Sequence, residues 1–297
     1  MARPSRARLA ARRLLAFTLL IGFFVLAAWL GFRTLEAGSS NESSDPPPAT
    51  TAAVRRGPVL RVVFPEGFTR QQMVERVAAV RVIAKRKRKL TPRLNGKAYA
   101  AATQAAKPPR QFRRQARGIE GFLFPATYAF TPKTTSRTLV RDQLASFAQN
   151  WSKVDLRAAR KKNLTPYDVL IIASMIERET IAPAERPLVA AVIYNRLKAG
   201  MPLGIDATIR YGLNVPGTEA LRVSQLESDN PYNTRNRTGL PPTPIANPGL
   251  ASMRAAARPA KVKYLFFVRK PDKVHHFFTA SESEFFAKAC DYGFGCG

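Results

Sequence analysis

The chain has 297 residues, of which 45% are hydrophobic, so it can bury a sizeable core in one large or two modest domains. This composition excludes a wholly disordered protein. Lys and Arg number 48 against 20 Asp and Glu, and the formal net charge of +28 predicts attraction to a polyanion such as nucleic acid, anionic lipid or an acidic envelope polymer.

Residues 14–32 form an uninterrupted apolar run of the length that crosses a bilayer as a helix. Several arginines precede it, so the positive-inside rule predicts a single-pass membrane protein with residues 1–13 in the cytoplasm and the body outside. A cleaved signal peptide is the alternative, and it is weaker because the run exceeds the usual apolar region and no good small-residue cleavage site follows. An extracytoplasmic body argues against nucleic acid as a partner.

Residues 33–58 are rich in Ser, Pro and Thr, the composition of a disordered linker. A strand is expected near residues 59–64, and a helix capped by Thr69 should follow it. The basic run at residues 84–89 is best explained as a solvated helix end or loop, with a dedicated binding patch as the alternative.

Apolar residues at helical spacing predict three further helices, over residues 136–151, 165–180 and 186–197. The remainder is rich in proline and is expected to form loops, until short apolar runs at 264–268 and 276–279 predict two strands. The fold class is therefore α+β.

The chain has two cysteines, Cys290 and Cys296, both close to its C-terminus. Neither has neighbouring ligand residues, so their spacing indicates no zinc site. Whether they pair in an oxidising compartment is left open by the sequence.

The helix predicted at residues 165–180 is hydrophobic until its last turn, which carries Glu177 and Glu179. At helical spacing Glu179 continues the stripe of Ile172 and Ile176, whereas Glu177 lies roughly 200° away. A carboxyl at the edge of an apolar core is partly desolvated, which raises its pKa toward values suited to a general acid. Glu179 is the candidate acid and Glu177 its solvent-side or supporting neighbour. The ordinary alternative for both is a solvated helix end.

Several motifs between residue 118 and about 280 follow one another in order. They are EGFLFP (120–125), ASMIERET (173–180), AVIYNRL (191–197), DATIRYG (206–212), PYNT (231–234), GLPP with IANPG (239–249), and YLFFV with HFF (264–278). In this order they resemble the motifs of the endolytic murein transglycosylases of bacterial inner membranes, the MltG-type or YceG-like family.

The resemblance implies a membrane-anchored lyase that cleaves the MurNAc–GlcNAc β-1,4 bond of nascent peptidoglycan without water. It would leave 1,6-anhydro-MurNAc ends and so terminate strand elongation. One carboxyl, matched here by Glu179, would protonate the leaving oxygen and then accept the proton of the sugar's 6-hydroxyl. No cofactor or metal is implied. The expected partners are glycan strands, the membrane through the N-terminal helix and a peptidoglycan synthase, with no nucleic acid.

Four further positions match family residues expected to line a glycan groove: Asp206, Thr208, Tyr232 and Asn233. Hydrogen bonds that stabilise loops explain such residue types equally well. A second group is expected to support the site: Glu177, Glu185, Asn195 and His276. A lone histidine on a strand is more often structural than catalytic.

By the same resemblance residues 59–110 correspond to a shortened LysM-like subdomain and residues 111–297 to the catalytic domain. The chain departs from the family pattern at Ala207, where the family has proline, and at Arg235, where it has tyrosine. A non-catalytic scaffold that binds peptidoglycan is the alternative function. A membrane-tethered nucleic-acid binder is disfavoured because few aromatic residues interrupt the basic run.

Overall fold

A computed structural model describes residues 58–294, and these belong to one compact unit. The predicted membrane helix at 14–32 and nearly all of the predicted linker lie outside the described residues. Among the helices that are described, none combines the length and the hydrophobicity needed to span a bilayer.

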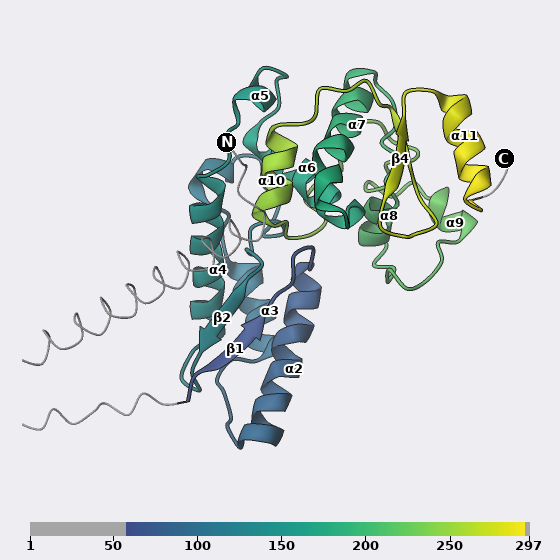
Figure 1. Cartoon of the computed structure of the whole chain (residues 1–297). Helices are drawn as coiled ribbons and strands as arrows, with labels where there is room; N and C mark the ends of the chain where they lie inside the picture. The colour runs from purple at the N-terminus through teal and green to yellow at the C-terminus, as the bar shows by residue number, and fades with distance from the viewer. Residues whose placement is uncertain (1–57, 295–297) are drawn as a thin grey trace, which may run out of the picture. The chain divides into compact units, whose positions relative to one another are not determined.

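The N-terminal part of the described chain is a β1–α2–α3–β2 unit (Figure 1). β1 (Leu60–Val63) pairs antiparallel with β2 (Thr127–Phe130), and α2 (Arg70–Arg88) packs against α3 (Gly96–Ala105). The strand and the helix capped by Thr69 are confirmed. The β1–β2 pairing crosses the domain boundary expected at residue 110.

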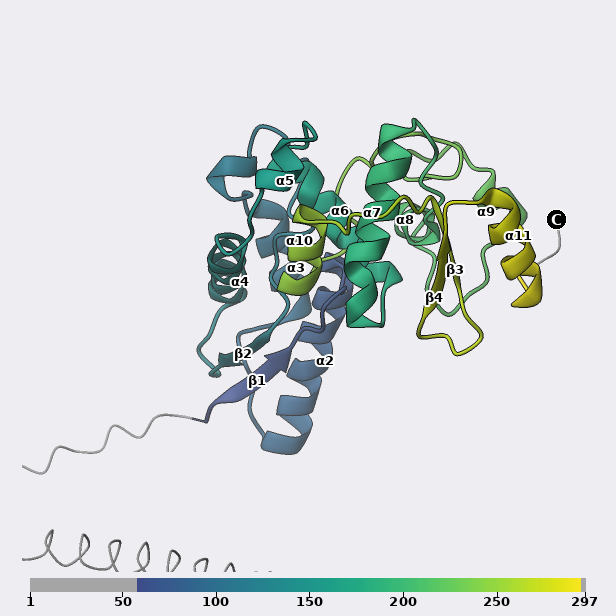
Figure 2. The ribbon, with the colours of Figure 1, turned by 45° about the horizontal axis from the view of Figure 1, so that its top comes forward.

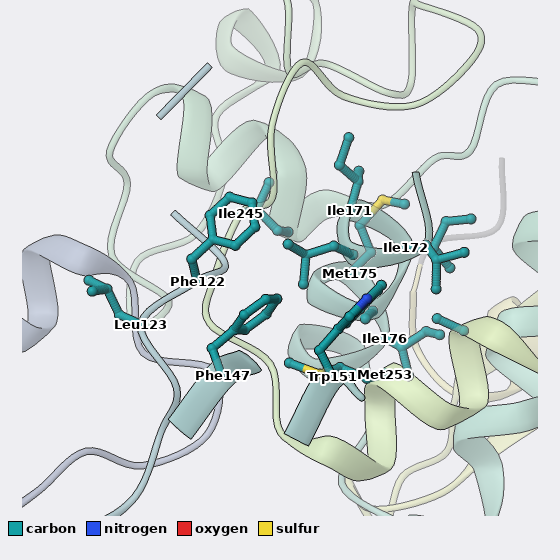
Figure 3. Close-up of a cluster of buried hydrophobic side chains, with 14 of the residues drawn as sticks. Phe122, Leu123, Phe147, Trp151, Ile171, Ile172, Met175, Ile176, Ile245 and Met253 are labelled. Carbon is teal, nitrogen blue, oxygen red and sulfur yellow. The ribbon is translucent and has the colours of Figure 1, made fainter. Parts of the chain in front are cut away.

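A cluster of aromatic rings joins this unit to the rest of the core (Figure 3). It forms where the short helix η1 (Arg110–Phe112) meets α4 (Ser136–Trp151), whose bounds match the prediction. Phe122 lies edge-on to Phe147 at 5.1 Å between ring centroids and to Phe112 at 5.0 Å. Such edge-to-face pairs add to the stabilisation from apolar burial.

The centre of the fold is α6 (Pro166–Glu179), which begins with a capping box formed by Thr165 and Asp168. Around it lie α5 (Arg157–Arg160), η2 (Pro183–Glu185), α7 (Arg186–Lys198), α8 (Asp206–Gly212) and α10 (Leu250–Ala257). Because α7, α8 and α10 all contact α6, Leu170 and Ser174 are as completely buried as Ile172. The core therefore covers both the side of α6 that carries Ile172 and the side that carries Leu170 and Ser174.

The C-terminal part is an antiparallel hairpin of β3 (Phe266–Arg269) and β4 (His276–Thr279), packed against α11 (Glu282–Asp291) (Figure 2). The hairpin confirms the two predicted strands, and the mixture of helices with two small antiparallel sheets confirms the α+β class. The short helices α3, α8, α9 (Val223–Leu226), α10 and α11 were not predicted, since so few turns give little periodic signal.

Truncation of a core ring should test the cluster in Figure 3. Phe147→Ala should lower the free energy of unfolding by about 3–5 kcal/mol, because it removes a fully buried ring and leaves a cavity. Phe286→Ala is the matched control, since Phe286 is 54% exposed, and it should change stability by about 0.5 kcal/mol or less. Urea unfolding of both variants provides the comparison, and equal midpoints would contradict the packing described.

Candidate active site

Glu179 is the last residue of α6, at a point where three elements meet. The helix stops there because Thr180 is extended, and its hydroxyl donates to the Ile176 carbonyl at 2.7 Å. Arg269 of β3 donates to the Glu179 carbonyl at 3.4 Å. The backbone N–H of Ala207, in the first turn of α8, donates to the Glu179 side chain. The carboxyl therefore lies between α6, α8 and β3.

Burial raises the pKa of Glu179 to about 7, and desolvation is the main cause. The negative charge of Asp206 raises it further, whereas Arg269, Arg178 and the Ala207 N–H lower it. The residue as a whole is nevertheless partly exposed, because α6 ends there, even though its carboxyl is desolvated. A carboxyl of this kind can exist in either protonation state near neutral pH, as a group that first donates and then accepts a proton must.

Glu177 lies in a different environment on the same helix turn. Its side chain is only 6% exposed, and one carboxylate oxygen accepts the Gly249 N–H at 2.9 Å. The other lies 3.8 Å from the Arg186 guanidinium. Burial raises the pKa of nearby Glu66, and the Glu177 charge adds to that shift. Glu177 is thus not a solvent-side residue, because the loop before α10 covers it and uses it as an acceptor.

Asp206 and Tyr232 both keep exposed surface near the start of α8 and the loop that follows it. The Asp206 carboxylate pairs with Arg235 at 2.7 Å, and both side chains are 44% exposed. The Tyr232 hydroxyl lies 2.8 Å from that of Thr243, and its ring meets Tyr211 edge-on. Either residue can present polar atoms or a ring face to a ligand.

Thr208 and Asn233 are fully buried, in contrast to their expected place in a groove. The Thr208 hydroxyl donates to the Ile205 carbonyl at 2.6 Å and lies 2.9 Å from the Thr234 hydroxyl. The Asn233 amide donates to the carbonyls of Leu226 and Ser228, at 2.8 Å each. The Thr208 hydroxyl and the Asn233 amide therefore form hydrogen bonds within the protein. For these two residues the burial favours the alternative of loop stabilisation over the expected contact with glycan.

His276 and Glu185 form a buried pair on the other side of the α6 terminus. The Glu185 carboxylate accepts the His276 backbone N–H at 2.9 Å and lies 2.7 Å from Nδ1 of the ring. Asn195 donates to the carbonyls of Val262 and Tyr264, just before β3. These contacts attach the hairpin that carries Arg269 to η2 and α7.

Sequence reasoning assigned no role to Glu120, which is buried where α2, α8 and the loop before α10 meet. Its carboxylate accepts the Arg70 N–H at 3.0 Å, the Asn247 amide at 2.7 Å and the Tyr211 hydroxyl at 3.3 Å. Burial raises the pKa of Glu120 to about 7. The sequence feature that could have indicated a buried carboxylate is that Glu120 directly precedes the apolar stretch 121–124. No feature of the sequence indicated that Arg269 lies beside Glu179.

Within the described residues, no cluster of three or more His, Cys, Asp or Glu side chains is arranged to hold a metal ion. The arrangement defines a class of site with one carboxyl of raised pKa, Glu179, that can transfer protons. The charges around it are the carboxylate of Asp206 and the guanidinium groups of Arg178 and Arg269.

Comparison with known proteins places the chain in a family. The YceG-like family matches residues 23–290, so the chain belongs to this family. Two curated relatives are called endolytic murein transglycosylases: one from Bacillus subtilis (strain 168), 39% identical over 152 residues, and one from Streptococcus pneumoniae (strain D39), 36% identical over 155 residues. The matches cover 51% and 50% of this chain but only 42% and 28% of those relatives. The chain therefore matches less than half the length of each.

The crystal structure of a YceG-like protein from Listeria monocytogenes has a similar fold, with a TM-score of 0.64 and 27% sequence identity. The superposition covers 75% of this chain and 74% of that one. The mixed helical architecture is therefore shared along most of both chains.

The buried pair of Glu185 and His276 offers a test of how the hairpin is held. Glu185→Ala should lower the free energy of unfolding by about 3 kcal/mol, because it leaves the buried His276 ring and N–H without their acceptor. Asp272→Asn removes the charge beside the exposed His275 ring but keeps a side-chain oxygen that can accept the Val274 and His275 backbone N–H groups, so it should leave stability close to that of the parent. Thermal unfolding distinguishes the two, and similar losses in both would show that burial is not the cause.

Proposed function

We propose that this protein is a lytic transglycosylase that cleaves the MurNAc–GlcNAc β-1,4 bond within nascent peptidoglycan strands without water, leaving 1,6-anhydro-MurNAc ends. The observation that carries the proposal is Glu179, a partly exposed residue at the end of α6 whose pKa is raised to about 7. Family membership and the name shared by two curated relatives support the same substrate. Termination of strand elongation is the proposed consequence for the cell wall.

In the proposed mechanism protonated Glu179 donates its proton to the glycosidic oxygen as the bond breaks. The carboxylate that results is stabilised by the Ala207 N–H and the positive charge of Arg269. It then accepts the proton of the sugar's 6-hydroxyl while that oxygen closes onto the anomeric carbon, which leaves no role for water. Asp206 is paired with Arg235 and is proposed to bind substrate together with Tyr232.

Residues 14–32 are proposed to anchor the protein in the cell membrane with the body outside, so that it meets newly made strands beside a peptidoglycan synthase. The β1–α2–α3–β2 unit has the order of a LysM-like subdomain and is proposed to be one. The catalytic part would then follow β2.

The role of Glu179 as the acid can be tested with a side chain of nearly the same shape that has no acidic proton. Glu179→Gln in the full chain should lower release of anhydro-muramyl products from uncrosslinked strands by about 100-fold or more, because the amide cannot donate the proton. Mass spectrometry of the digested strands gives the measurement. Glu75→Gln changes an exposed carboxyl on α2 and should retain parental activity. Full activity of Glu179→Gln would reject the assignment, and strand binding without any product from the parent would favour the scaffold function.

The pH profile should report the charges around Glu179. The acid works only when protonated, so activity should fall as pH rises through about 7. Asp206→Asn removes a negative charge that raises the pKa and should move this fall to lower pH. Arg269→Gln removes a positive charge that lowers the pKa and should move it to higher pH. The measurement is kcat/KM as a function of pH for the parent and both variants. If both variants shifted the fall in the same direction, the assigned effects of Asp206 and Arg269 on the pKa of Glu179 would be contradicted.

A further inference from the structure

The C-terminal end of α2 carries a concentration of positive charge that the proposed reaction does not use. Its last turn consists of Lys85, Arg86, Lys87 and Arg88, and Lys89 caps it. Together with Arg93 and Lys97 these residues form what we call the basic end. Residues 76–119 contain no Asp or Glu, and none of these cations forms an ion pair with any described residue. The helix dipole favours a few cations there, but it does not account for so many uncompensated charges.

The basic end lies at the end of the unit where the described chain begins (Figure 1). The Arg93 N–H donates to the Pro132 carbonyl at 2.9 Å, two residues after Phe130, which pairs with Leu60 at the start of β1. The chain that precedes residue 58 therefore enters beside these cations. The 25 residues from 33 to 57 can span at most about 85 Å, which limits the distance from the basic end to the apolar run at 14–32.

Exposed apolar side chains accompany the charge on the outer face of α2. Val82 is 49% exposed and Ile83 is 53% exposed, and at helical spacing they flank Arg86 one turn later. Apolar residues interleaved with Lys and Arg on one helix face are typical of surfaces that lie in the headgroup region of a membrane. Binding to single-stranded nucleic acid would call for aromatic side chains, which this face lacks.

A pocket of about 440 Å³ opens between α2 and the start of α3, within the same surface. Arg81, Lys85 and Lys97 contribute to its wall, beside Asn95 at the N-cap of α3. The Arg81 Nε donates to the Pro92 carbonyl at 3.3 Å, which holds the guanidinium at the wall. Three cations around a space of this size suit the phosphate of a lipid headgroup.

We propose that the basic end docks on an anionic membrane surface, with a headgroup phosphate in this pocket and Val82 and Ile83 at the headgroup boundary. The 19 residues of α2 make the helix about 28 Å long. Just before its other end, the Gly67 carbonyl accepts a hydrogen bond from Arg178 of α6 at 3.3 Å. Docking would therefore use α2 as a spacer that holds Glu179 about one helix length from the bilayer, whichever reaction occurs there.

The test uses the full chain mixed with vesicles of phosphatidylcholine alone or with added phosphatidylglycerol, and measures acetylation of each lysine by mass spectrometry. Lys85 and Lys97 should react at least about threefold more slowly on anionic vesicles, and high salt should abolish the difference. Exposed Lys261 is the internal reference and should react equally on both. Because no activity is measured, the outcome is separate from that for the transglycosylase proposal.

A matched pair of variants completes the experiment. Docking of the basic end should also slow the acetylation of Lys87 and Lys89 on anionic vesicles. The double variant Lys85→Glu with Lys97→Glu should remove that protection, whereas Lys261→Glu with Lys263→Glu, an equal charge change elsewhere, should preserve it. Equal acetylation on both vesicle types would overturn the proposal. So would equal protection by soluble inorganic polyphosphate, since it would show a general polyanion site in place of a membrane surface.

Discussion

The burial of α6 on every side is the constraint on which the rest of the structure depends. A helix surrounded by α7, α8 and α10 has no solvated face along most of its length, so any carboxyl on it must be satisfied by neighbours or shift its pKa. The helix comes near the surface only at its two ends, the first turn with Pro166 and Asp168 and the last turn from Glu177. Glu179 lies in the last turn, where a carboxyl can be desolvated by the core while its residue is still partly exposed.

Three glutamates show how different surroundings give the same side chain different roles. Glu177 is buried but accepts a backbone N–H and lies near Arg186, so it holds a loop. Glu120 is buried and accepts hydrogen bonds from three separate segments, so it fixes their relative positions. Glu179 is stabilised as a carboxylate by the Ala207 N–H and the charge of Arg269, and its residue is partly exposed. Because the pKa of Glu120 and that of Glu179 are both raised to about 7, partial exposure at the end of α6 is what separates the candidate acid from Glu120.

The two departures from the family pattern that lie nearest the site both affect its charge. Ala207 stands where proline is expected, and its N–H donates to Glu179, a donor that proline lacks. Arg235 stands where tyrosine is expected, and it pairs with Asp206, whose charge raises the pKa of Glu179. The surroundings of the candidate acid are thus adjusted in this chain by residues that do not carry the reaction.

The sequence by itself determined the elements whose signals are local: the bounds of α4, the capped start of α2, the two strands of the hairpin and the α+β class. It also singled out Glu179, because helical spacing shows which residues share a face. It could not show that the opposite face of α6 is covered too, that Thr208 and Asn233 are used inside their loops, or that β1 pairs with β2 across more than sixty residues. Only the tertiary structure decided these points, since burial and strand pairing depend on segments remote in sequence, while periodicity reports only local geometry.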